Sequence, residues 1–599
     1  MKKILKTSLI FVFTLAVFGL WLIALFHISN LWRGDSDNAF PVIAGRAILH
    51  GNFLLKGYYL SSLVTYYPVD LYLNAAFIKI LGFRTVLIHI IPIFIFLTLI
   101  VVAMFYVNDA YDRNHEKLAF KIGLIMLLVF LAMPAGAFAF FMLQELHGST
   151  IVLSLIVILI FNKFIKEKTG GYIYLFLGFA VLTITLTNDN LALVIAVIPL
   201  LAALAVFYYA DFKSKTALNY IAITGKTKSG IKKSAYLFTL LAVIFSTASK
   251  KIILAAIREL GGFRLASSGI PIAFVCLKYL PKNIYFFIGG LLRLLDANFF
   301  GKYLFSKFTF IILAKFVIVG SVLIYTAYAI TVKFKKSLKE TNTNTNTNTN
   351  INANKERPEN NFINFIDLTL LFGIILLTAA FLLSDIALSK ASARYLTPAA
   401  VYGLILAFRN IPGAVSKYYE RVSFKIIGAI IIVVYTSSFI YAALTPIPKS
   451  PFRPLACWLK KHGLKYGYGS YFDSGVITLM SDNKIKVRQA LSGINGKIVQ
   501  YKWVSNENWY KKKAVFVIYS EHFICGGIDK DSVINTFGKP SKLYVEDFQG
   551  TIGKAYGRPD GKYTMPPYVI MVYKNGIIID GKKDKNVRKG KYAKHGAGG

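Results

Sequence analysis

Long apolar segments recur along this chain and constrain its fold more than any other feature. We expect about eleven of them to be membrane-spanning helices, because each comes close to the ~20 residues that an α-helix needs to cross a bilayer. The first runs from Thr7 to Ser29. The others lie at residues 85–107, 119–141, 149–164, 171–187, 190–210, 235–256, 307–333, 364–384, 394–409 and 426–445. The expected fold class is therefore an α-helical polytopic membrane protein.

The composition supports a membrane protein. Of the 599 residues, 55% are hydrophobic and only 16% are charged, which excludes an ordinary soluble domain. The basic start "MKKILK" precedes an apolar segment that is too long for the core of a signal peptide, so we expect a signal anchor. The formal net charge of +40 favours anionic partners. We expect these to be membrane lipids and a phosphate-bearing substrate, and no nucleic acid.

The loops between the apolar segments differ in charge, and this predicts their orientation. Loops such as "NDAYDRNHEK" and "KFIKEK" carry Lys and Arg residues, whereas "QELHGS" and "LTNDN" carry none. Because basic loops tend to stay in the cytoplasm, we expect a cytoplasmic N-terminus in the inner or plasma membrane of the cell. The same alternation puts Asp35, Asp37 and the chain after Leu444 on the extracytoplasmic side.

Three regions interrupt the apolar pattern within the expected membrane domain, residues 1–445. Residues 38–80 and 257–306 are too polar to span a membrane and too apolar for free loops, so we expect amphipathic helices on the outer face. The run "TNTNTNTNTNINAN" has no apolar face to bury. It predicts a disordered cytoplasmic linker over residues 338–362.

The composition changes at "TPIPKSPFRP", which marks a domain boundary. Beyond it the helix-like "LACWLKKHG" is followed by the strand-like runs "KIKVRQAL", "KAVFVIYS", "KLYVED" and "YVIMVYK". We expect residues 446–580 to form a small extracytoplasmic α/β domain. Residues 581–599 are basic and predict a disordered tail.

Several polar side chains lie at the expected outer ends of the spans. They are Asp35, Asp37, Asp70, Glu145, His147, Asn188, Asp189 and Arg394. Polar groups at this depth are costly unless they pair or line a wet cavity, so they mark a candidate site. The alternative is that each is an ordinary interface residue. That alternative explains the acid pair Asp35 and Asp37 least well, because a long half-apolar segment follows it.

The motifs around these residues resemble a known enzyme class. The segments "GDSDNA", "ILHGNFLLKGYYLSS", "LPKNIYFFIGGLLRLLDANFFG", "TNDNLALV" and "ARYLTPAAV" are similar to the GT-C class of glycosyltransferases that use polyprenyl-phosphate sugars, within it to a group of bacterial multispanning proteins. The resemblance covers most of the chain outside the Thr–Asn linker and the extreme tail. It implies transfer of a hexosyl or pentosyl unit from the lipid phosphate to a glycan, lipid or protein acceptor, on the extracytoplasmic face and with inversion.

The resemblance also implies that an acid of the first outer loop is the general base. The pattern "GDS" of the bacterial group points to Asp35, whereas the spacing to Gly51 that is general for the class points to Asp37. The sequence favours Asp35. The usual acidic pair of the class is replaced here by Asp37 followed by Asn38, which weakens a direct carry-over.

The remaining candidates would bind substrate. Arg394 and Lys282 could meet the donor phosphate, since a departing phosphate needs positive charge nearby. Asp70, His147, Asn188, Asp189 and Tyr395 could contact sugar hydroxyls. A divalent metal such as Mg or Mn is an open alternative, with Asp37 and Asp189 as its ligands.

A lipid or polysaccharide flippase or transporter is the rival function. Such a protein would carry charged or broken segments in mid-membrane and often an internal repeat. The polar groups here lie at the outer ends instead, so the sequence favours a glycosyltransferase.

Overall fold

The computed structural model describes most of the chain. The described residues are 2–32, 34–111, 117–144, 147–167, 171–218, 229–266, 273–303, 305–343, 364–387, 390–415, 418, 421–493, 495–520, 527–548, 551–552, 563–564 and 567–579. The predicted tail at 581–599 lies outside them, and so does most of the predicted linker. Helix α12 continues to Thr343, so the first residues of the expected 338–362 linker are helical instead.

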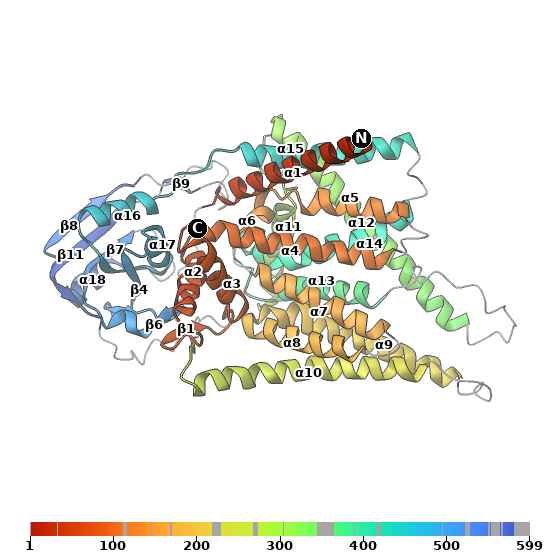
Figure 1. Ribbon diagram of the computed structural model, residues 1–599, viewed down its shortest axis with the longest axis horizontal. Coiled ribbons are helices and arrows are strands. Elements are labelled where there is room, and N and C mark those ends of the chain that lie inside the picture. The colour runs from red at the N-terminus through yellow and green to blue at the C-terminus, as the bar shows by residue number, and fades with distance from the viewer. Residues whose placement is uncertain are drawn as a thin grey trace.

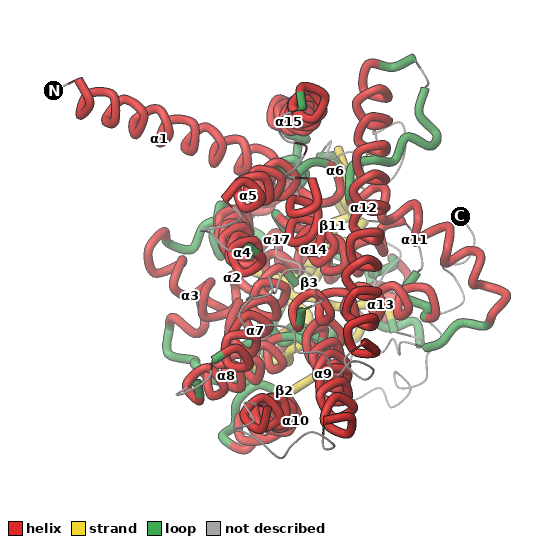
Figure 2. Tube along the Cα trace, turned by 90° about the vertical axis from the view of Figure 1, so that its right-hand side faces the viewer, coloured by secondary structure: helices red, strands yellow, loops and turns green. Residues whose placement is uncertain are grey.

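Long helices running side by side form the body of the molecule (Figure 1). Seven contain a segment long and apolar enough to cross a membrane, which confirms a polytopic helical membrane protein. They are α1 (Lys2–Ser29), α4 (Leu87–Ala110), α7 (Gly148–Lys166), α10 (Ser229–Glu259), α12 (Lys307–Thr343), α13 (Phe365–Leu383) and α15 (Val422–Leu444). Viewed along the bundle, α1 projects away from the other helices (Figure 2).

The other expected spans are helical but shorter or bent. The segment 119–141 consists of α5 (Lys117–Leu131) and α6 (Gly136–Met142), which meet at 88°. Helix α8 (Tyr172–Asn188) and the helical stretch Leu193–Tyr209 are apolar but short, and α14 (Thr397–Val415) contains the buried Arg409. Within the described residues, length and apolarity therefore support seven spans, or eight with the bent pair, rather than about eleven.

The first outer segment is more irregular than the sequence predicted. It contains α2 (Ser36–Leu49), the short strand β1 (Tyr58–Ser61) and α3 (Val69–Leu81). The prediction of surface helices throughout residues 38–80 is therefore wrong in part. Residues Tyr58–Ser61 form the strand β1, which pairs with other strands. Helix α2 is packed rather than laid on a surface: a Cβ added to its Gly45 would lie 2.8 Å from Asn74 Cβ of α3.

The second outer segment, within 257–306, also mixes element types. Helix α10 ends at Glu259, the short strand β2 (Arg264–Ala266) follows, and α11 (Leu280–Leu294) begins after a 3₁₀ turn, η2 (Leu277–Tyr279). Of the side chains of α11, only Asn283, Gly290 and Leu294 are buried. Helix α11 therefore has a single buried face, as expected for an amphipathic helix in this segment.

The C-terminal region forms an α/β unit around a six-stranded sheet with the order β5-β4-β3-β7-β11-β8. Its strands are β3 (Tyr466–Gly469), β4 (Lys486–Ser492), β5 (Ile498–Gln500), β7 (Ala514–Ser520), β8 (Lys542–Glu546) and β11 (Tyr568–Ile577). Its helices are α16 (Phe452–Lys461), α17 (Tyr471–Met480) and α18 (Lys530–Phe537). The predicted helix and the four predicted strands are present. The central strands β4, β3 and β7 are parallel, which requires the crossover helix α17 that the sequence analysis missed.

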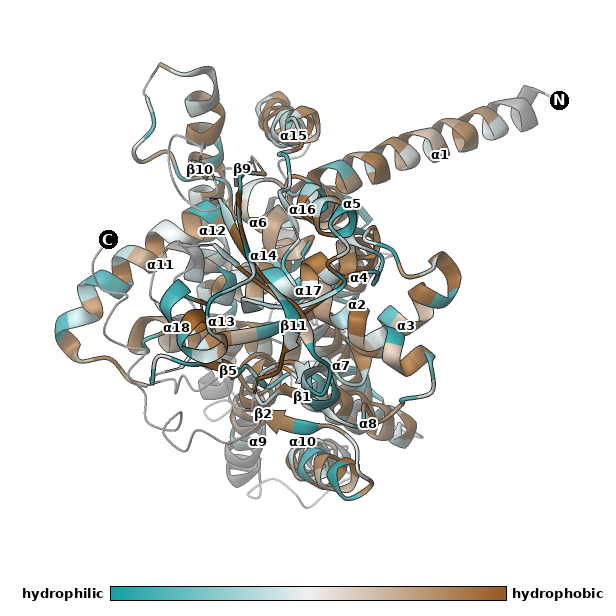
Figure 3. Ribbon diagram, turned by 90° about the vertical axis from the view of Figure 1, so that its left-hand side faces the viewer, coloured by the Kyte–Doolittle hydropathy of each residue, from teal (hydrophilic) through white to brown (hydrophobic). Residues whose placement is uncertain are grey.

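A small second sheet joins the outer loops to this unit. Strand β1 pairs in parallel with β2 and antiparallel with β6 (Ser505–Asn506). Figure 3 looks onto this end of the molecule, with the strands in front of the helices. Since the three strands come from three distant parts of the chain, their pairing holds both outer segments against the C-terminal unit.

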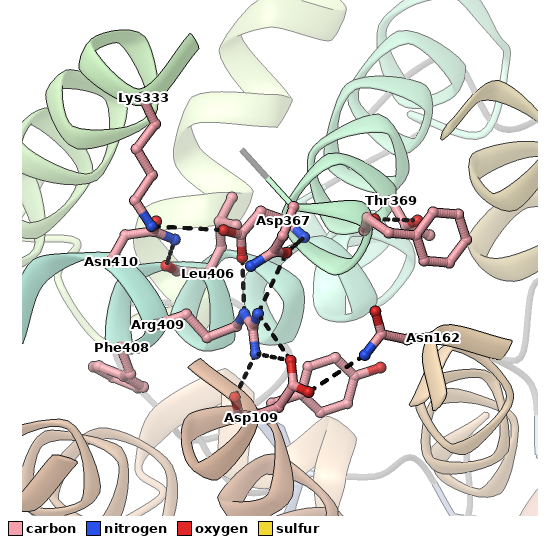
Figure 4. A network of polar contacts seen from close by, with 12 residues as sticks. Asp109, Asn162, Lys333, Asp367, Thr369, Leu406, Phe408, Arg409 and Asn410 are labelled. Atoms are coloured by element: carbon pink, nitrogen blue, oxygen red, sulfur yellow. Dashed lines mark hydrogen bonds and ion pairs between the residues drawn. The ribbon is translucent and has the colours of Figure 1, made fainter. Parts of the chain in front are cut away.

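Buried charges join the helices at the opposite end of the bundle (Figure 4). Arg409 of α14 is 2% exposed, and its Nε donates to Asp367 of α13 at 2.8 Å. Its Nη2 lies 3.4 Å from Asp109 of α4, which also binds Lys166 of α7 at 2.7 Å. Lys333 of α12 lies 3.9 Å from Asp367. One cation thus fastens α4, α13 and α14, because a buried charge is stable only when it is paired.

Candidate active site

Asp37 lies in the first turn of α2, where the C-terminal unit docks. The hydroxyl of Tyr471, at the start of α17, donates a hydrogen bond to Asp37 Oδ1. One turn further along α17, the N–H of Gly475 donates to Ser36 Oγ at 2.8 Å. A side chain at 475 would collide, since an added Cβ would lie 2.9 Å from that hydroxyl oxygen. The acid is therefore enclosed by a segment that is very distant in sequence.

Asp35 has a different local role. It is the N-cap of α2, and its Oδ1 accepts hydrogen bonds from the N–H groups of Asp37 at 2.9 Å and Asn38 at 3.2 Å. The Asp35 N–H donates in return to Asn38 Oδ1 at 3.3 Å, which completes a capping box. The "DSDN" sequence thus starts a helix at Asp35 and leaves Asp37 as the acid that faces the C-terminal unit.

Asp189 and His147 form the second part of the site. His147 Nδ1 lies 2.6 Å from Asp189 Oδ2, and the Thr150 hydroxyl donates to the same oxygen at 3.0 Å. The Leu191 N–H donates to Asp189 Oδ1 at 2.9 Å. His147 is the N-cap of α7 and has a φ of 60°, which is uncommon for a residue other than glycine. The end of α8 and the start of α7 therefore hold this pair in one orientation.

Asp70, at the start of α3, is the third part of the site. Its Oδ2 accepts hydrogen bonds from Ser149 Oγ and Asn188 Nδ2, both at 2.9 Å. Its Oδ1 is buried and accepts no hydrogen bond from any described residue. Asp70 and His147 line a pocket of about 10 Å³, on the order of one water molecule. This pocket is too small for a sugar and suits a bound water beside the unpaired oxygen.

The environment shifts the protonation of these groups. Burial raises the pKa of Asp70 to about 6, although its two hydrogen bonds oppose the shift. Burial also raises the pKa of Asp37, against the opposing effects of the Tyr471 hydrogen bond and the positive charges of Arg394 and His147. Burial lowers the pKa of His147, but the charge and hydrogen bond of Asp189 outweigh it and the net shift is upward. A carboxylate with a raised pKa is a stronger base.

Arg394 and Tyr395 lie at the edge of the site. They belong to η4 (Lys390–Leu396), the 3₁₀ segment that leads into α14. The Arg394 guanidinium is exposed, donates to the Tyr395 hydroxyl at 2.8 Å and lies 4.8 Å from the centre of that ring. Because its charge acts on both Asp37 and His147, Arg394 belongs to the same cluster.

Lys282 is not brought to this cluster in the described residues. It is exposed on α11, and its ammonium lies 5.6 Å from the centre of the Phe286 ring, within the same helix. The other predicted residues, by contrast, come together from α2, α3, α7, α8 and η4. We call Asp37, Asp70, His147, Asn188, Asp189 and Arg394 the outer cluster.

In the part of the chain that the structure describes, the outer cluster offers no ready set of ligands for a divalent metal. Among the described residues, which exclude 145–146, no three His, Cys, Asp or Glu side chains converge as ligands. Both oxygens of Asp189, one of the two proposed ligands, already accept hydrogen bonds from His147, Thr150 and Leu191. The positive charges that act on Asp37 come from the side chains of Arg394 and His147.

Sequence reasoning missed three residues of the site. Ser149 and Thr150 could have been found, because they follow His147 directly at the start of an apolar segment. Tyr471 gave no such signal. It lies in the distant "YFDSG" run, and only the docking of α17 against α2 places its hydroxyl on Asp37.

No known protein family and no curated protein matches this chain. Two solved structures are similar to it. One is the Archaeoglobus fulgidus oligosaccharyltransferase in its apo form, at 13% identity and a TM-score of 0.43, covering 84% of this chain and 69% of that one. The other is the oligosaccharyltransferase AglB of the same archaeon, in complex with an inhibitory peptide and a dolichol-phosphate, at 14% identity, with the same TM-score and coverage.

Proposed function

We propose that this protein is a membrane glycosyltransferase that transfers a sugar from a polyprenyl-phosphate donor to an acceptor hydroxyl. The observation that carries the proposal is the placement of Asp37. A half-buried carboxylate with a raised pKa lies where α2 meets the C-terminal unit, within reach of the charges of Arg394 and His147. Sugar transfer from a phosphate requires a base and a cationic group in the same site.

The chemistry needs one base and no general acid. Asp37 would take the proton of the acceptor hydroxyl as that oxygen attacks the anomeric carbon. Phosphate departs from the opposite face of the sugar, so the configuration inverts, as when a carboxylate activates water in an inverting glycosidase. The charge on the departing phosphate would be stabilised by Arg394, whose planar guanidinium can bind two phosphate oxygens.

The choice of Asp37 over Asp35 follows from their hydrogen bonds. The Asp35 oxygen that caps α2 is occupied by two backbone N–H groups, and such bonding stabilises the carboxylate as an anion. Asp37 carries a side-chain partner, Tyr471, that can orient it toward an acceptor. We therefore assign the base to Asp37 and the helix start to Asp35, which reverses the preference drawn from the "GDS" pattern.

The remaining members of the outer cluster would shape the site. Asp70 and Asp189 are tied to Ser149, Asn188 and His147, so their role is to hold the loops between helices in place around the site. The charge pattern of the loops supports a reaction on the extracytoplasmic face, with a cytoplasmic N-terminus. A glycan, lipid or protein could supply the acceptor hydroxyl.

The proposal is tested with membranes that contain the protein or its Asp37→Asn variant, supplied with radiolabelled polyprenyl-phosphate hexoses and pentoses. We expect the wild type to move label from the lipid to an envelope fraction, and the variant to leave it on the lipid. A flippase would instead carry the intact donor between leaflets without cleaving the sugar–phosphate bond. If membranes with the wild type and membranes with Asp37→Asn move the uncleaved donor lipid between leaflets equally well, the protein is a flippase.

A further inference from the structure

Arg488 of β4 is a buried cation with no acidic partner among the described residues. It is 6% exposed, and its guanidinium carbon lies 4.1 Å from the centre of the Trp509 ring and 5.9 Å from that of Tyr466. Its Nε finds no acceptor among the described residues and no described carboxylate forms an ion pair with it, while the Tyr466 hydroxyl is a hydrogen-bond partner of the guanidinium. The aromatic rings stabilise the charge only in part, so a positive potential remains at this point.

Further cations lie beside Arg488 and around its neighbour Lys486. Lys486 lies two positions earlier on the same strand and therefore projects from the same face of the sheet. Burial lowers the pKa of Lys486, and the positive charges of Arg488, Lys512 and Arg46 lower it further. Lys512 comes from the exposed "KKK" run that precedes β7, and Arg46 comes from the last turn of α2. We call these four residues the cationic seam.

The wider region has the same sign of charge. Residues 446–580 contain twenty Lys and Arg residues but only ten Asp and Glu residues. Repulsion between like charges that lie close together destabilises a fold, and a bound anion would relieve that repulsion. The seam lies outside the outer cluster and takes no part in the chemistry proposed there.

We propose that the cationic seam binds an anionic group, a phosphate or a carboxylate, carried by a glycan acceptor. This inference rests on the proposed function, because it names the chemical class of the acceptor. Helix α2 connects the two places: Asp37 is in its first turn and Arg46 in its last, nine residues and roughly 14 Å apart. An acceptor that reaches both must be an oligomer. A single sugar cannot bridge them.

The experiment measures binding and needs no transfer activity. The full-length protein, purified in a neutral detergent, is titrated into fluorescently labelled oligogalacturonate, a carboxylate-bearing glycan. The control probe is the same oligomer with its carboxylates methyl-esterified. We expect the acidic probe to bind and to weaken with rising salt, and the neutral ester not to bind.

Matched variants locate the binding. Lys486→Gln with Lys512→Gln should weaken probe binding at least tenfold. Lys460→Gln with Lys461→Gln removes the same charge from exposed positions on α16 of the same unit, and should leave binding unchanged. Arg488 is left intact, because its ring contacts make folding depend on it. Equal losses in the two double variants, or no loss in the first, would overturn the proposal.

Two further measurements separate the alternatives. Asp37→Asn should lower transfer by about 10²–10⁴-fold and keep full probe binding. Probe binding would therefore support the cationic seam even if the transferase proposal fails. Anionic phospholipid is another source of phosphate, and neutral vesicles with and without phosphatidylglycerol are therefore added as competitors. Displacement of the probe by phosphatidylglycerol vesicles alone would identify the seam as a lipid site and exclude an acceptor site.

Discussion

The Tyr471 hydroxyl donates a hydrogen bond to the Asp37 carboxylate across 434 positions of sequence. The contact joins the first outer segment, where the proposed base lies, to the C-terminal unit. Beside it the N–H of Gly475 binds Ser36. The C-terminal unit is therefore part of the proposed site, and its removal should affect catalysis as well as stability.

The two acids of the first outer loop should respond differently to the same change. Asp37→Asn removes the base and should lower transfer by about 10²–10⁴-fold, the usual contribution of general base catalysis. Asp35→Asn should keep nearly full activity, because Asn caps helices as well as Asp does. Initial rates at matched protein levels measure both. If Asp35→Asn is the more damaging variant, the assignment of the base is wrong.

Loss of the Tyr471 hydroxyl should change the pH dependence. Burial raises the pKa of Asp37, and the Tyr471 hydrogen bond opposes that rise. In Tyr471→Phe the pKa of Asp37 should therefore rise further. Since the base acts when ionised, the acidic limb of kcat/KM should move to higher pH. Tyr544→Phe, on β8, makes the same change away from Asp37 and should leave the profile in place, whereas a shared shift would speak against the contact.

Asp70 should make the protein less stable as pH rises. Its folded-state pKa of about 6 lies above its ordinary value, so the neutral form suits the fold. The resulting stability is fully present below the unfolded-state pKa near 4 and is lost as pH rises through about 6, by roughly 3 kcal/mol. Asp70→Asn should remove this slope and raise the unfolding temperature at pH 7. If the unfolding temperatures of the wild type and of Asp70→Asn change in parallel between pH 4 and pH 7, Asp70 is not the source of the pH dependence.

Arg394→Lys tests the phosphate contact. The lysine keeps the charge but loses the planar fork that binds two oxygens. We expect the KM for the lipid donor to rise about tenfold, or ~1.4 kcal/mol, with little change in thermal stability. Arg84→Lys, at an exposed position between α3 and α4, is the control and should behave as wild type. An unchanged KM in Arg394→Lys would remove Arg394 from the donor site.

Arg409→Met should destabilise the bundle without touching the outer cluster. The change leaves Asp367 and Asp109 without their shared cation, and breaking a buried ion pair costs about 3–5 kcal/mol. Thermal unfolding in detergent measures the loss. Arg84→Met removes an exposed arginine and should cost much less. Equal unfolding temperatures for the two variants would show that the network contributes little.

The apolar segments by themselves determined that this is a helical membrane protein, because hydrocarbon excludes unpaired backbone groups and permits few alternatives to a helix. Alternating apolar residues likewise predicted four strands of the C-terminal sheet. Charge along the loops grouped Asp37, Asp70, His147 and Asp189 at one end of the bundle, and the structure brings them together there.

Only the tertiary structure distinguished the two acids of the first outer loop. Asp35 and Asp37 are equivalent by composition and differ by two positions, but a helix turns by 100° per residue, so they face different neighbours. One becomes a cap, and the other meets Tyr471. Two other features also depend on contacts between distant segments. They are the pairing of β1 with β2 and β6, and the approach of Arg46 to Lys486. Contacts between segments hundreds of residues apart depend on packing, which no local pattern of residues records.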